Sequence, residues 1–243
     1  MRAYLRTTCV VGLTLAVGAG CRSQPEPPPP QGPSPLVAAI QEAQRRMHVR
    51  FTAAQRIEQA VAHSDLDRAR AEAHDLAGLE EPEALPVWRP YFESIKDSAR
   101  QIEAATSIGA VATLTGGLGR TCARCHEAIS AHITFPVEPP PPADPKLAQQ
   151  MLGHQWAAAQ MWQGLIGPSD ARWQAGARAL TTVPLNTVAQ AATPAAPVEI
   201  DDVARVRMYA NRAQGIGPQD ERAELYGTLL GTCAHCHALL RDR

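Results

Sequence analysis

The chain has 243 residues, with 23 Lys and Arg against 24 Asp and Glu, so its formal net charge is only −1. This balance gives no support for nucleic-acid binding or for strong electrostatic steering of a charged partner. Aromatic residues make up 5% of the chain, which is low for hydrophobic cores of this total size.

The N-terminus has the composition of an export signal. Arg2 and Arg6 precede the short apolar run 9–17, and the small residues 18–20 lead to Cys21. The run is too short for a membrane span. The segment resembles a bacterial lipoprotein signal over residues 1–20, which implies lipidation of Cys21; an ordinary secretory signal cut near Ala19 or Gly20 is the alternative. Residues 21–35 are rich in proline and predict an extended tether.

The next hundred residues predict four helices. Apolar residues recur at steps of three and four over 36–61, 66–76, 88–102 and 107–133, which is the period of amphipathic helices. Asp65 has the character of an N-cap before the second helix, and Pro82 and Pro86 interrupt the chain before the third. Residues 36–135 therefore form the first expected domain.

A second proline stretch, 136–145, precedes a half with a similar plan. Apolar periodicity covers 147–165, 170–180, 200–210 and 226–240, whereas the Ala-, Thr- and Pro-rich stretch 184–197 predicts a loop. The similar spacing suggests an internal repeat. We expect an all-α protein made of two tandem four-helix bundles, at 36–135 and 146–243, joined by the linker 136–145.

Each half has the same motif on its last helix. The motif is C-x-x-C-H, at Cys122, Cys125 and His126 and again at Cys233, Cys236 and His237. This is the attachment signature of haem c. Cysteines three residues apart on a helix face the same side and can form thioethers with one porphyrin, while the adjacent histidine can bind its iron as proximal ligand.

Other uses of these cysteines fit less well. Zinc would require the two pairs close together, or a spaced histidine pair, and the two motifs are more than a hundred residues apart. A thioredoxin-like motif would lie in a βαβ pattern, which the sequence lacks. We therefore expect two covalently attached haem c groups, which would also supply apolar bulk to cores poor in aromatic residues.

A motif on the C-terminal helix of a four-helix bundle resembles the class II c-type cytochromes, the cytochrome c-prime group. The likeness covers residues 36–133 and, less closely, 146–240. Some members of the group use a methionine of the first helix as distal iron ligand, which implies Met47 for the first haem and Met151 for the second. The long stretch 184–197 and the presence of His154 depart from the family's pattern, and His154 is an alternative distal ligand that would give two histidines.

Other residues near these positions are expected to have ordinary roles. Met47 could equally be core packing, since it lies on the apolar stripe of its helix. Arg120 and Arg124 flank the first motif and could pair with haem propionates or face solvent. Met161 and Met208 are expected in the core, and four histidines are expected at solvated positions: His48, His63, His74 and His132.

These features predict an exported electron carrier and not an enzyme. It would pass electrons between redox proteins on the periplasmic side of a bacterial membrane, held there by the lipid anchor. If the methionines do not bind iron, the alternative is a five-coordinate protein that binds or senses NO or CO. A dihaem peroxidase is the third choice, because the chain is short and lacks an evident set of distal catalytic residues.

Overall fold

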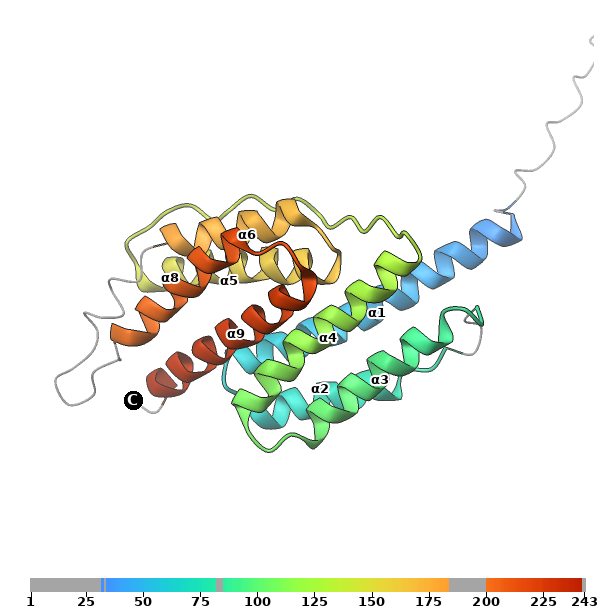
Figure 1. The fold of residues 1–243 in the computed structure, drawn as a ribbon, viewed down its shortest axis with the longest axis horizontal. Coiled ribbons are helices and arrows are strands. Elements are labelled where there is room, and N and C mark those ends of the chain that lie inside the picture. The colour runs from blue at the N-terminus through green and yellow to red at the C-terminus, as the bar shows by residue number, and fades with distance from the viewer. Residues whose placement is uncertain (1–31, 33, 82–84, 184–199, 242–243) are drawn as a thin grey trace, which may run out of the picture. The chain divides into compact units, whose positions relative to one another are not determined.

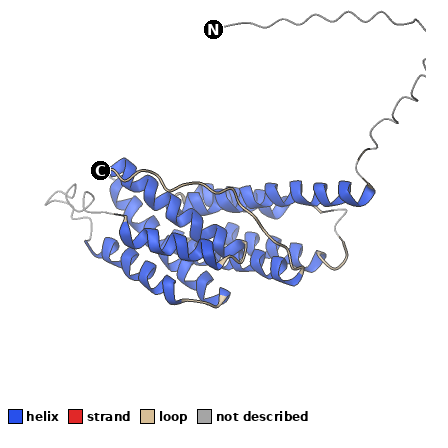
Figure 2. Cartoon of the chain, turned by 90° about the horizontal axis from the view of Figure 1, so that it is seen from above, coloured by secondary structure: helices blue, strands red, loops and turns tan. Residues whose placement is uncertain are grey.

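The computed structural model describes residues 32, 34–81, 85–183 and 200–241. Within these residues the fold is all-α, with eight helices and no strand. Figures 1 and 2 show how the helices are arranged. No helix among them is both long enough and apolar enough to cross a membrane. By its internal contacts the chain divides into Met1–Gln41 and a compact unit, Glu42–Arg243, and the packing described below concerns the second.

The first half contains helices α1 (Pro35–Ala62), α2 (Leu66–Gly78), α3 (Arg89–Ala104) and α4 (Ile108–Ala128). Side-chain caps fix two of their starts: Asp65 accepts a hydrogen bond from the Arg68 amide, and Ser107 from the Ala110 amide. Such caps satisfy amides that have no partner inside the helix. Helix α3 packs between α2 and α4, so these helices share one apolar core.

The second half contains α5 (Leu147–Ile166), α6 (Asp170–Thr182), α8 (Ile200–Gly215) and α9 (Gln219–Arg241). Ser169 caps α6 by accepting a hydrogen bond from the Arg172 amide. Helix α6 packs against α5 and α8, and α8 packs against α9. The indole of Trp173, fully buried on α6, donates a 2.9 Å hydrogen bond to the carbonyl of Ala213 on α8 and so ties these two helices together.

The two motif helices, α4 of the first half and α9 of the second, pack closely against each other and lie side by side in Figure 1. Glycines allow this close approach. A Cβ at Gly116 would collide with the carbonyl oxygen of Ala223, and one at Gly227 would lie 3.0 Å from the carbonyl oxygen of Ala112. The order of these contacts makes α4 and α9 antiparallel, so the two cysteine pairs lie toward opposite ends of the interface.

The predicted helices agree with the described ones except at three ends: α8 continues to Gly215 instead of ending at residue 210, α9 begins at Gln219 instead of residue 226, and α4 is shorter than predicted. Helix α4 ends at Ala128 instead of continuing to residue 133. The chain turns there because Ser130 has a φ of 51°, in the left-handed region. The expected loop at 184–197 lies outside the described residues, as do the expected signal segment 1–20 and Cys21.

Candidate haem-attachment sites

The first motif occupies the last two turns of α4. Cys122 is half-buried, and Cys125 is buried with 5% of its surface exposed. The Nδ1–H of His126 donates a 2.8 Å hydrogen bond to the carbonyl of Ile166, the last residue of α5. Burial lowers the pKa of His126, and this hydrogen bond opposes the shift only in part. The ring is therefore oriented through Nδ1, which leaves Nε2 for another partner.

The second motif occupies the last turns of α9, where Cys233, Cys236 and His237 are all half-buried. His237 hydrogen-bonds to the backbone of Ala62, the last residue of α1. Burial is again the main cause that lowers the histidine's pKa, followed by the neighbouring His63. The rings of His63 and His237 lie 5.6 Å apart, centroid to centroid.

The two motif histidines therefore have exchanged partners. His126 of the first half binds the end of α5, and His237 of the second half binds the end of α1. A histidine that ligates a metal commonly donates its other ring N–H to a carbonyl, which fixes the ring's orientation. No pattern in a single sequence signals this exchange, because it depends on how the halves pack.

The cysteines do not have the character of reactive thiols. Burial is the main cause that raises the pKa of Cys122 and of Cys233 to about 12. Nucleophilic or redox-active cysteines need a lowered pKa. No three His, Cys, Asp or Glu side chains within the described residues come together in a way that could hold a metal ion. The raised pKa values give Cys122 and Cys233 little nucleophilic character in this environment.

The distal candidates lie on α1 and α5. Met47 is half-buried and packs against the hydrophobic core, as its place on the apolar stripe predicts. Met151 and His154 are also half-buried, one turn apart on α5. The position three residues after Met47 is occupied by Arg50, a buried arginine that is 7% exposed and whose importance the sequence did not reveal.

The remaining sequence predictions have mixed outcomes. Met161 is fully buried as expected, but the expectation that Met208 lies in the core is wrong, since its side chain is 54% exposed. Met208 lies on the solvent side of α8. Four histidines are exposed as predicted: His48, His63, His74 and His132.

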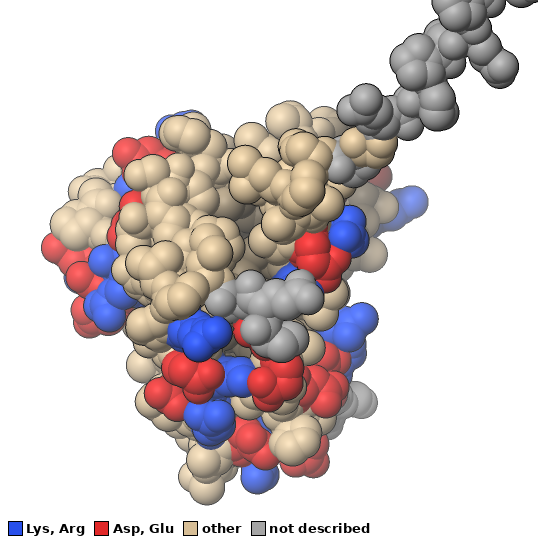
Figure 3. Space-filling model, turned by 90° about the vertical axis from the view of Figure 1, so that its right-hand side faces the viewer, with Lys and Arg blue, Asp and Glu red and all other residues tan. Residues whose placement is uncertain are grey.

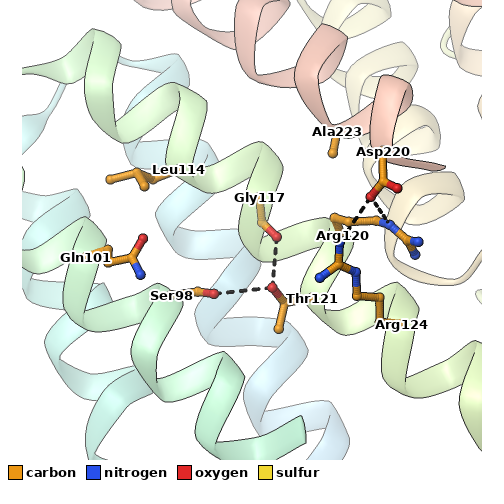
Figure 4. Close-up of a pocket in the computed structure, with 9 residues that line it drawn as sticks. All are labelled: Ser98, Gln101, Leu114, Gly117, Arg120, Thr121, Arg124, Asp220 and Ala223. Carbon is orange, nitrogen blue, oxygen red and sulfur yellow. Dashed lines mark hydrogen bonds and ion pairs between the residues drawn. The ribbon is translucent and has the colours of Figure 1, made fainter. Parts of the chain in front are cut away.

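Arg120 and Arg124 line a cleft of about 320 Å³ between α3, α4 and α9 (Figure 4). Arg120 donates a 2.6 Å hydrogen bond to Asp220, which also accepts from Arg124 at 3.3 Å. Arg120 binds Glu127 as well, at 2.9 Å. These arginines therefore link α4 to the first turn of α9 and are not simply solvated.

Comparisons with known proteins add no identification: no family model, no curated protein and no solved structure matches the chain. On the face shown in Figure 3, basic and acidic side chains are intermixed without a large region of one sign. This distribution agrees with the near-zero net charge.

Proposed function

We propose that the chain is an exported dihaem c-type cytochrome that carries electrons between redox proteins. In this proposal Cys122 and Cys125 hold one haem c, Cys233 and Cys236 hold the other, and His126 and His237 are the proximal iron ligands. The proposal includes a fold of two tandem four-helix bundles of the class II type, at 36–135 and 146–243. It assigns the protein no enzymatic activity.

The observation that supports this function best is the repeated environment of the two motif histidines. Each follows its cysteine pair on a helix and forms a hydrogen bond to the backbone at the end of another helix. A proximal histidine of a haem needs an oriented, neutral imidazole with one nitrogen left for iron. The recurrence in both halves makes a chance arrangement a poor explanation.

The location follows from the same chemistry. Haem c is attached on the outer side of the bacterial inner membrane, so the chain must be exported, and the lipidated Cys21 would hold it on the periplasmic side. The partners would be soluble or membrane-bound redox proteins. With a net charge of −1, their recognition would depend little on long-range attraction.

The first test is the haem content of the protein matured in a host that assembles cytochromes c. Pyridine haemochrome assay and intact mass should give two covalent haems per chain. C122A/C125A and C233A/C236A should each lose one haem, while the exposed-residue control His48→Ala keeps both. A wild-type chain without covalent haem would refute the proposal.

A second function is the binding of a small gas such as NO or CO at the first centre, the proposed haem at Cys122 and Cys125, and one observation favours it. The position three residues after Met47 is occupied by Arg50, whose side chain is held by Glu81 and by the Leu79 carbonyl at 3.3 Å. A guanidinium does not ligate iron, so Met47 is the candidate on which six-coordination of this centre depends. CO uptake by the reduced wild-type protein at one of two haems would favour this function.

A further inference from the structure

The first helices of the two halves have matching positions. Arg50 lies three residues after Met47, and His154 lies three residues after Met151. Fifteen residues after each come the two helix caps, Asp65 and Ser169. Twelve residues after each come Ala62 and Ile166, the residues to which the motif histidines hydrogen-bond. Arg50 and His154 are therefore equivalent in position along their helices.

At the first centre this position holds a cation with fixed partners. Arg50 binds Glu81 and lies over the ring of Phe92, with its guanidinium carbon 4.8 Å from the ring centroid. Its charge opposes, in part, the effect of burial that raises the pKa of Cys122 in the motif of its own half.

At the second centre the same position holds an imidazole with a free nitrogen. One ring nitrogen of His154 is taken by a hydrogen bond to the backbone of Val183. The other, Nε2, is shielded from solvent and finds no hydrogen-bond partner among the residues that the structure describes. A ring nitrogen that is shielded from solvent and has no hydrogen-bond partner lowers the stability of the folded protein unless a ligand binds to it.

His154 also lies on the part of α5 that packs against α9, the helix of the second motif. The hydroxyl of Tyr226 on α9 donates a 3.4 Å hydrogen bond to the carbonyl of Ala158, one turn after His154 on α5.

We propose that His154 is the distal iron ligand of the second centre, which would then have two histidine ligands, whereas the first centre would have His126 as its one histidine ligand and Met47 as its distal candidate. The inference rests on the proposed function, and it replaces Met151 as the preferred ligand of this centre. Two histidines give a lower potential than histidine with methionine. The two centres would therefore differ in potential, and electrons would pass from the second to the first.

His63 lies near His237, and it serves as the matched control. Its Nδ1 bonds the carbonyl of Gln59 at 2.7 Å, and its side chain is exposed at the end of α1. It therefore lacks the shielded, unpartnered nitrogen that distinguishes His154.

The test is electron paramagnetic resonance and absorption spectroscopy of the ferric dihaem protein, with haem content measured in the same samples. His154→Gly should convert one of the two haems from a low-spin form to a high-spin form, and added imidazole should restore the low-spin signal. His63→Ala and Met151→Ala should leave both haems as in the wild type. Potentiometric titration should show that only the lower-potential centre shifts in His154→Gly.

Two results would overturn the inference. One is an unchanged low-spin signal in His154→Gly, and the other is a Met151→Ala variant that shows the high-spin form instead. In both cases two covalent haems would still be present, so the proposed function would stand. Absence of covalent haem from the wild type would reject the proposed function itself.

Discussion

Tyr226 on α9 donates a 2.7 Å hydrogen bond to the carboxyl group of Glu58 on α1, and both side chains are buried. The phenol ring also stacks on Trp162 of α5, with centroids 5.5 Å apart. These three residues join the first helix of each half to the second motif helix. The only acid in this cluster, Glu58, has its pKa raised by burial to about 7, against the opposing effects of the Tyr226 hydrogen bond and of His63.

The raised pKa of Glu58 predicts that the stability of the protein depends on pH. Between pH 4.5 and about 7 the folded protein holds a proton on Glu58 that the unfolded chain has lost. The free energy of unfolding should therefore fall as pH rises through this range, by roughly 3 kcal/mol in total. Urea unfolding from pH 5 to 8 measures it: the slope should be largely lost in Glu58→Gln and kept in the exposed control Glu224→Gln. An equal slope in Glu58→Gln would contradict the assignment.

The contact between α4 and α9 predicts that alanine substitutions at two adjacent glycines change the stability of the protein in opposite directions. Gly116→Ala places a methyl group against the Ala223 backbone and should destabilise the protein by about 1–3 kcal/mol. Gly117→Ala meets nothing within 4 Å and should stabilise by roughly 0.5–1 kcal/mol, because alanine favours the helix. Chemical denaturation of both variants checks the pair. Equal effects would show that α4 and α9 do not pack closely in solution.

Met47 gives a prediction for the first centre. If its sulfur binds iron, Met47→Ala should abolish the long-wavelength ferric band typical of a methionine–iron bond and open one haem per chain to CO. Met208→Ala is the matched control, because this methionine is 54% exposed on α8. An unchanged spectrum in Met47→Ala would assign Met47 to packing alone.

The lipid anchor is tested by cell fractionation. Cys21→Ser should move the protein from the membrane to the soluble periplasmic fraction, with its two haems retained. Membrane association that persists in this variant would leave the ordinary secretory signal as the better interpretation.

Periodicity predicted the helices well because each helix buries one apolar face. Ile57 and Val61, one turn apart, are both fully buried, as the stripe on α1 requires. The end of α4 was not predictable, since Ser130 adopts its left-handed φ without any glycine to signal it. The spacing of the motifs likewise singled out Cys122 and Cys233 as candidate haem-attachment residues. It gave no sign of the buried Arg50 or Glu58, because their hydrogen-bond partners lie on distant segments of the chain.

The exchanged hydrogen bonds of His126 and His237 bear on how the chain could have evolved. They are the contacts expected if two copies of one ancestral half had formed a two-fold dimer before fusion into one chain. In such a dimer every substitution appears at both centres at once. After such a fusion each copy could mutate independently, and Arg50 and His154 would be equivalent positions at which the two copies acquired different chemistry.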